Sequence, residues 1–155
     1  MSIKLEHVTY TYSPGTAYEI HALKDVSLEI PQGQFLGVIG HTGSGKSTLI
    51  QHFNGLMRPT SGRVLYNGAD IWGENYKLRE LRFHVGLVFQ YPEHQLFESD
   101  VITDVCFGPK NQGLSPEECR KQAERSLQHV GIPEELYEKS PFDLSGGQKR
   151  RVAIA

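Results

Sequence analysis

The chain has 155 residues, of which 38% are hydrophobic and 22% are charged, and its formal net charge is −2. This length suffices for one domain with a sizeable core, and the nearly neutral charge gives no reason to expect a nucleic-acid partner. No run reaches the roughly eighteen apolar residues of a membrane span, and the N-terminus lacks the pattern of a signal peptide. Cys106 and Cys119 have neither metal-binding nor redox spacing. We therefore expect a soluble intracellular chain.

The first part of the chain predicts an antiparallel sheet. Residues 3–12 and 25–30 place apolar side chains on one face, which is typical of half-buried strands. Residues 63–71 contain the pair Asn67-Gly68, the strongest short hairpin signal, between two short strands.

Two nearly continuous apolar runs predict a different kind of strand. Residues 34–40 (QFLGVIG) and 84–90 (HVGLVFQ) are typical of strands buried on both faces of a parallel sheet. Helices follow in the second part of the chain. Ser115 begins a predicted helix with a capping-box pattern, and Gly131 and Pro133 end it.

The strongest chemical signal is GHTGSGKS, residues 40–47, which fits the pattern G-x-x-x-x-G-K-[ST] at every position. Gly43 and Gly45 let the backbone take positive φ and approach phosphate oxygens closely. Successive N–H groups would then surround an anion at a helix N-terminus. We expect Lys46 to reach the β- and γ-phosphates and the Ser47 hydroxyl to bind Mg²⁺. The alternative, a chance match in a flexible glycine loop, is disfavoured by the flanking strand and helix.

Two further features distinguish among classes of P-loop protein. Gln90 ends the second apolar run, at the edge where open α/β sheets bind ligands, so we expect its side chain near the γ-phosphate. LSGGQ follows at residues 144–148. This arrangement resembles the nucleotide-binding domain of ABC ATPases over the whole length from Met1 to Ala155. Phrases such as VGLVFQYPEHQLFE and PFDLSGGQKRRVAIA resemble, more narrowly, the ATPase subunits of energy-coupling factor transporters.

The resemblance implies an α/β fold of the P-loop NTPase type, with a central mostly parallel sheet, an antiparallel β subdomain and a helical subdomain. Residues 1–155 would be part of one nucleotide-binding domain. The antiparallel β subdomain and P-loop core would occupy about residues 1–90, the helical subdomain about 91–144, and the start of the signature helix 145–155. Because no stop signal precedes Ala155, we expect a truncated chain, the N-terminal part of such a subunit.

The resemblance also assigns nucleotide-binding residues. Tyr12 matches the aromatic residue that stacks on adenine, with Tyr10 as a competitor and an ordinary strand tyrosine as the alternative. The phosphate loop comprises Gly40, His41, Thr42, Gly43, Ser44, Gly45, Lys46, Ser47 and Thr48. His41 has no partner at ligand spacing, so a backbone contribution is favoured over zinc binding. Lys46 and Gln90 are the expected catalytic residues, and Ser47 and Gln90 are the expected contacts to Mg²⁺.

The signature is expected to act on a neighbouring subunit through Ser145, Gly146, Gly147 and Gln148. The start of this helix is a second candidate anion site, and three basic residues follow, Lys149, Arg150 and Arg151. These cations either only point to solvent or indicate that the helix end expects an anion. In ABC ATPases the signature closes on the nucleotide of the opposite subunit. The resemblance therefore implies ATP and Mg²⁺ as cofactors and a second ATPase subunit, identical or different.

Energy-coupling factor transporters import vitamins or cobalt and nickel ions. Their two ATPase subunits lie under a transmembrane coupling subunit and a substrate-binding membrane subunit. A peripheral protein at the cytoplasmic face of the cell membrane is therefore implied, without a nucleic-acid partner.

A set of apolar residues at helical spacing either belongs to the helical core or lines a groove that receives a short helix of the membrane subunit: Phe97, Val101, Ile102, Val105 and Phe107.

A hydrolysing ABC subunit also needs an aspartate, a glutamate and a switch histidine beyond the signature, and none of these lies in this sequence. We therefore expect residues 1–155 alone to be inactive and prone to aggregation, because the two apolar runs would lack neighbours. A non-catalytic nucleotide-binding module is one alternative. A DNA-repair ABC ATPase is another, although the long coiled-coil or zinc-bearing insertions of that class are not seen.

Overall fold

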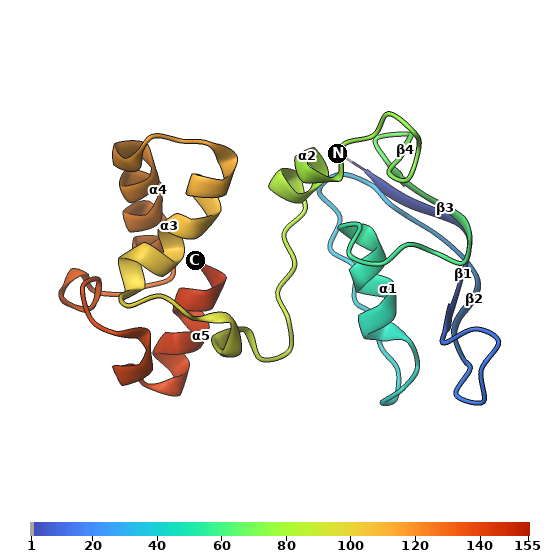
Figure 1. Ribbon diagram of the computed structural model, residues 1–155, viewed down its shortest axis with the longest axis horizontal. Coiled ribbons are helices and arrows are strands. Elements are labelled where there is room, and N and C mark those ends of the chain that lie inside the picture. Colours follow the sequence, from blue (N-terminus) through green and yellow to red (C-terminus); the bar gives the residue numbers. More distant parts are fainter. Residues whose placement is uncertain (1) are drawn as a thin grey trace. The chain divides into compact units, whose positions relative to one another are not determined.

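The computed structural model describes residues 2–155, and the chain divides into two compact units between Leu87 and Val88 (Figure 1). The first unit combines an antiparallel sheet with two helices, and the second contains only helices. Among residues 2–155, no helix combines the length and the apolar character that a bilayer span requires. The assignment of these units to the subdomains named above stays a prediction.

The sheet of the first unit has four strands in the order β2-β1-β3-β4, and all its pairs are antiparallel. The strands are β1 (Ile3–Tyr12), β2 (Ile20–Ile30), β3 (Ser61–Tyr66) and β4 (Ala69–Asp70). The predicted hairpin is confirmed: Asn67 and Gly68 link β3 to β4 with φ of 50° and 82°. Two consecutive left-handed residues are what a tight hairpin turn requires.

A β-bulge at His7 determines which side chains of β1 face the helices. The register with β2 and β3 shifts at this point, and the His7 backbone is left-handed, with φ 51°. Its Nδ1 lies 2.7 Å from Oδ1 of Asp25, a second left-handed residue, on β2. Because a bulge adds one unpaired residue, Leu5 and Val8 are both fully buried despite their odd spacing.

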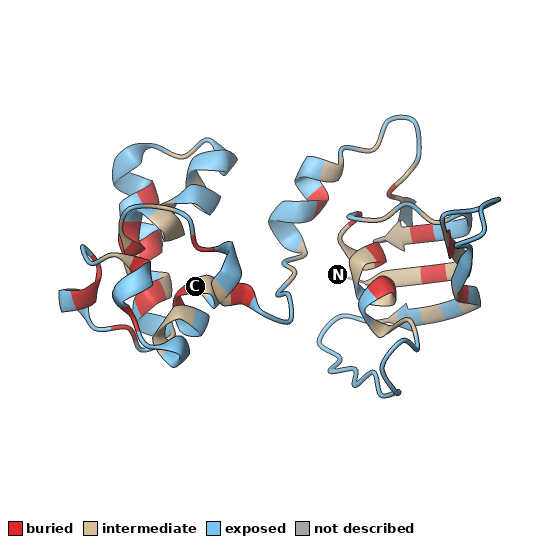
Figure 2. Ribbon diagram, turned by 60° about the horizontal axis from the view of Figure 1, so that its bottom comes forward, coloured by how far each residue is buried: buried red, intermediate tan, exposed pale blue. Residues whose placement is uncertain are grey.

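The core of the first unit lies between the sheet and the helices α1 (Lys46–Phe53) and α2 (Leu78–His84). Leu49 and Phe53 of α1 pack against it, and α2 contributes Leu81. Figure 2 colours the buried residues red. The buried apolar cluster consists of Leu5, Val8, Leu23, Val64, Ile71 and Leu81.

The start of α1 is pressed against β2. Gly45, the residue before the helix, is left-handed with φ 87°. A Cβ atom at Gly45 would lie 2.5 Å from the carbonyl oxygen of Ala22 and 3.3 Å from Cδ2 of Leu23. Only glycine fits a left-handed backbone this close to a strand.

The second unit has a separate helical core. Its helices are η1 (Pro92–Gln95), α3 (Val101–Gln112), α4 (Pro116–His129), η2 (Glu134–Leu136), η3 (Pro141–Asp143) and α5 (Gly146–Ile154). The predicted capping box of α4 is confirmed, since Ser115 and Glu118 bond each other's backbone N–H groups. The core residues are Leu96, Val101, Ile102, Ala123, Leu127, Ile132, Leu136, Tyr137, Leu144 and Val152.

The two predicted parallel strands are wrong for the described residues. Residues 34–40 are irregular, and 84–90 divide between the end of α2 and an irregular segment. Phe35 and Ile39 are each 97% exposed, and Val88 is 58% exposed. A buried parallel strand forms only where neighbouring strands accept its hydrogen bonds, and every strand pair within residues 2–155 is antiparallel. The expectation that these apolar runs lack neighbours agrees with this exposure.

We predict that Gly45→Ala destabilises the first unit more than Gly43→Ala does. Both glycines are left-handed, so each substitution should cost about 1–2 kcal/mol from backbone strain. Only at Gly45 does the added methyl also collide with a strand carbonyl, because nothing lies within 4 Å of a Cβ at Gly43. Urea denaturation of the two variants measures the difference, and equal losses would contradict the close approach of α1 to β2.

We also predict that stability falls in acid because of His52. Its side chain is fully buried in α1, and burial lowers its pKa despite a hydrogen bond to the Thr48 carbonyl. Below about pH 6.5 the unfolded chain binds a proton that the folded chain does not, so the free energy of unfolding decreases as the pH falls. The slope for one proton is at most about 1.4 kcal/mol per pH unit.

Denaturation at about pH 7.5 and about pH 5.5 tests this dependence on the histidine. In His52→Leu the free energy of unfolding should fall less between the two pH values than in the wild type. Replacing the exposed His129 with Gln should leave that difference unchanged. An unchanged pH dependence in His52→Leu would refute the assignment.

Candidate functional site

The P-loop forms an open loop that leads directly into α1. A turn closed by Ser44 N–H donating to the His41 carbonyl, at 3.2 Å, begins it. Gly43 and Gly45 both have positive φ, as the sequence predicted. The N–H groups of Lys46, Ser47 and Thr48, in the first turn of α1, have no partner within residues 2–155. These donors, at the positive end of the helix dipole, form a site suited to an anion.

The Lys46 side chain reaches back across the loop. Its Nζ donates to the carbonyls of Gly40 and His41, each at 2.7 Å, and lies 3.3 Å from Oγ of Ser44. The ammonium is thereby held over the first residues of the loop. An ammonium beside free backbone N–H groups is the donor set that binds phosphate oxygens.

The hydroxyls of Ser47 and Thr48, the two residues after Lys46, have different surroundings. Ser47 is exposed, whereas Thr48 is 7% exposed and faces the sheet. The Thr48 Oγ1 lies 3.0 Å from the hydroxyl of Tyr12, which also donates to Sδ of Met57 at 3.8 Å. The first unit therefore brings Tyr12 and the phosphate loop together. Thr42 is exposed, and Nδ1 of the His41 ring lies 2.8 Å from the adjacent Thr42 carbonyl.

The donor set fits a nucleotide bound with Mg²⁺. The exposed Ser47 hydroxyl offers an oxygen ligand next to the anion site, and hard cations such as Mg²⁺ prefer oxygen. No group of three or more His, Cys, Asp or Glu side chains within residues 2–155 could hold a metal ion by itself. Any Mg²⁺ here would thus be bound through the phosphates and one or two side chains.

Gln90 and the signature belong to the second unit, whereas the phosphate loop belongs to the first. Gln90 is exposed, at a bend before η1. The predicted contact of Gln90 with Mg²⁺ or the γ-phosphate stays a prediction, since the structure does not place the two units relative to each other.

The signature forms a preformed helix start. Ser145 caps α5 by accepting from Gln148 N–H, and the Gln148 side chain accepts from Ser145 N–H at 2.9 Å. The N–H groups of Gly146 and Gly147 have no partner among the described residues. The capping box thus satisfies the N–H groups of Ser145 and Gln148, and the N–H groups of the two glycines stay open to an external acceptor.

Two of the three basic residues of α5, Lys149 and Arg150, have partners that neither interpretation of the sequence anticipated. Arg150 pairs with Glu93 of η1 at 3.2 Å, and Lys149 lies 6.0 Å above the ring of Phe142. Hydrogen bonds from its own backbone N–H and from Arg150 lower the pKa of Glu93. The charge of Arg150 is therefore balanced within the unit, by a partner that no local sequence pattern indicates.

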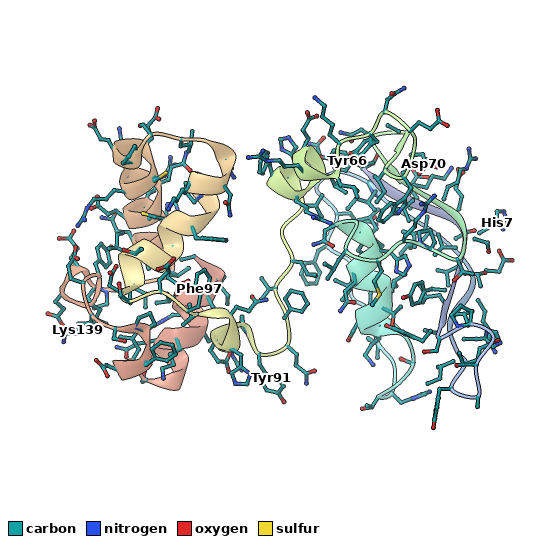
Figure 3. The ribbon with its side chains drawn as sticks, in the orientation of Figure 1. His7, Tyr66, Asp70, Tyr91, Phe97 and Lys139 are labelled. Atoms are coloured by element: carbon teal, nitrogen blue, oxygen red, sulfur yellow. The ribbon has the colours of Figure 1, made fainter. Side chains whose placement is uncertain are left out.

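The apolar residues around α3 are of two kinds. Val101 and Ile102 are buried in the core, whereas Phe97 is 58% and Phe107 is 45% exposed. The two phenylalanine rings meet edge to face at 5.2 Å, and Phe97 is labelled in Figure 3. The structure thus separates core positions from an exposed aromatic pair.

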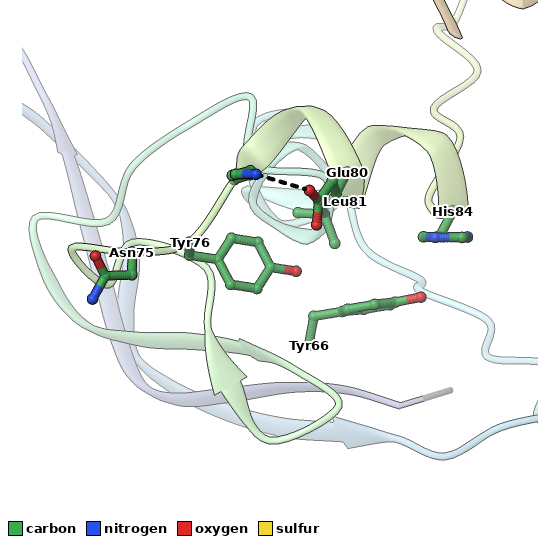
Figure 4. A pocket seen from close by; sticks show the side chains of 7 residues that line it. Tyr66, Asn75, Tyr76, Glu80, Leu81 and His84 are labelled. Carbon is green, nitrogen blue, oxygen red and sulfur yellow. Dashed lines mark ion pairs between the residues drawn. The ribbon is translucent and has the colours of Figure 1, made fainter.

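A hollow of about 340 Å³ in the first unit lies between β3 and α2 (Figure 4). The rings of Tyr66 and Tyr76 line it, and Lys77 and Glu80 form an ion pair of 3.6 Å at its rim. Burial raises the pKa of Tyr76. The lining shares no residue with the phosphate loop, so we assign it no part in nucleotide binding.

Comparison with known proteins agrees with these features. The family described as ABC transporter matches residues 23–155. The energy-coupling factor transporter ATP-binding protein EcfA2 of Caldanaerobacter subterraneus subsp. tengcongensis is 55% identical over 155 residues, all of this chain and 54% of that protein. The chain spans about half the length of the curated relatives it matches.

Solved structures give the same result. The structure of cbiO1 from Clostridium perfringens, described as part of the ABC transporter complex cbiONQ, is 43% identical with a TM-score of 0.81, covering 98% of this chain and 59% of that one. The ATP-binding cassette MJ0796, solved as a dimer in a post-hydrolysis state bound to ADP and Pi, is 33% identical with a TM-score of 0.82. That match covers 98% of this chain and 67% of the cassette.

These matches confirm the predicted fold class, since cassette structures align with nearly the whole chain. The family model covers most of the sequence, including the phosphate loop and the signature. The chain therefore belongs to the ABC transporter family.

Proposed function

We propose that this protein is the ATP-binding subunit of an importer of the energy-coupling factor type, and that it binds and hydrolyses MgATP in a pair of such subunits. The observation that carries the proposal is the phosphate loop, where Lys46 and the free N–H groups at the start of α1 surround one anion site. The names of the relatives support the transporter type.

Each residue has a distinct part in binding. Lys46 and the backbone donors of residues 43–48 hold the β- and γ-phosphates, and Ser47 contributes an oxygen to Mg²⁺. Tyr12 offers its ring to the adenine, since it is anchored beside the same helix. ATP supplies a phosphoanhydride bond whose hydrolysis releases free energy. Gln90 is the proposed sensor that orients water or Mg²⁺ beside the γ-phosphate.

The signature acts on the nucleotide of a second ATPase subunit, identical or different. Its open Gly146 and Gly147 donors, with Ser145 and Gln148 fixed by the capping box, suit an anion supplied from outside the chain. Closure of the pair then depends on the γ-phosphate, and hydrolysis removes this bridge. The dimeric form of the MJ0796 cassette supports such a pair.

The remaining partners are a transmembrane coupling subunit and a substrate-binding membrane subunit, which imports a vitamin or a cobalt or nickel ion. Phe97 and Phe107 form the exposed aromatic surface that we assign to the coupling subunit, because an apolar pair of this kind receives an amphipathic helix. The protein would therefore be peripheral, at the cytoplasmic face of the cell membrane.

We predict that Lys46→Ala weakens ATP binding about 10- to 100-fold, because the triphosphate loses its charged hydrogen-bond donor. Calorimetry on the full chain measures the affinity. The exposed Lys24 provides a matched control, and its replacement by alanine should leave the affinity unchanged. Equal affinities of wild type and Lys46→Ala would refute phosphate binding at this loop.

We further predict that Ser145→Arg abolishes ATP hydrolysis by the complete protein while ATP affinity stays nearly unchanged. The bulky cation would block the signature from reaching the partner's nucleotide. The control is Ser99→Arg, at an exposed serine of the same unit, which should retain turnover. Loss of binding together with turnover would instead assign the signature to the stability of its own subunit.

A further inference from the structure

Tyr12 is held in place partly by residues that lie outside the phosphate loop and the signature. Its ring meets the ring of Tyr10 edge to face, with centroids 4.8 Å apart and planes at 86°. Tyr10 in turn meets the ring of His52 at 5.1 Å and 76°. Edge-to-face contacts of this kind contribute about 0.5–1.5 kcal/mol each and fix ring orientation.

Two hydrogen bonds also connect His52 to Tyr12 through Thr48. The Nδ1 of His52 donates to the Thr48 carbonyl at 2.7 Å, and the Thr48 hydroxyl bonds the Tyr12 hydroxyl at 3.0 Å. Tyr10, Tyr12, Thr48 and His52 therefore form a closed set of contacts between β1 and α1, here called the tyrosine network. Thr48 belongs both to this network and to the phosphate loop.

His52 is an unusual residue for a purely structural role. It is fully buried, and its Nε2 has no hydrogen-bond partner within residues 2–155. A buried polar atom without a partner costs about 1–3 kcal/mol, which an apolar side chain of similar volume would avoid. The stability of the core therefore does not account for a histidine at this position.

We propose that Tyr10 and His52 are positioning residues that hold the ring of Tyr12 as the platform for the nucleotide base. They act through Tyr12 and do not touch the phosphates. The inference rests on the proposed function, because it presumes that a nucleotide binds at the phosphate loop. It adds a specific claim: the network determines base affinity separately from phosphate affinity.

The test compares two ligands that share the phosphates. Calorimetry on the full chain measures the affinity for MgATP and for magnesium tripolyphosphate, which lacks base and ribose. His52→Leu and Tyr10→Leu should weaken ATP binding about 5- to 100-fold, the range expected for one base-aromatic stack, and leave tripolyphosphate binding unchanged. Tyr10→Phe keeps the ring contacts and should bind both ligands as the wild type does.

A parallel loss of both ligands in His52→Leu, or no loss of either, would overturn the proposal, because a structural role predicts one of these results. His52→Leu should fold, since it removes the unpaired Nε2, so it decides the question even if Tyr10→Leu does not fold. Absence of tripolyphosphate binding in the wild type would instead overturn the proposed function itself. Tyr12→Ala serves as the reference for complete loss of base stacking.

Discussion

The close approach of Gly45 to the carbonyl of Ala22 is the constraint on which the candidate nucleotide site depends. It fixes the start of α1 against β2, and with it the direction in which the first-turn donors point. The same placement brings Thr48 within reach of Tyr12 on β1. One steric requirement thus connects the phosphate donors, the tyrosine network and the core beneath them, so a substitution at this point affects all three.

In the second unit, an ion pair connects two segments that are distant along the chain. The pair between Glu93 and Arg150 ties the segment after Gln90 to the signature helix. Because Glu93 follows Gln90 by three residues and Arg150 lies in α5, the ion pair favours movement of these two segments together. The same unit carries the exposed aromatic pair of Phe97 and Phe107.

Local signals in the sequence predicted much of this arrangement. The Asn67-Gly68 hairpin, the Ser115 capping box and the glycine pattern of the phosphate loop each depend on neighbouring residues only, and the structure has all three. The apolar runs at 34–40 and 84–90 failed as strands because a parallel strand depends on partners distant along the chain. The contacts of His52 and Glu93 were missed for the same reason, since no periodicity or motif indicates a tertiary partner.

The bulge at His7 has a consequence for how β1 tolerates change. It separates Leu5 from Val8 and the two tyrosines, and the register against β2 shifts here and again on either side of Tyr10. A slip of the first half towards the N-terminus can be absorbed at the bulge without turning Tyr12 away from α1. The irregularity therefore separates the proposed base platform from changes of register in the first half of β1.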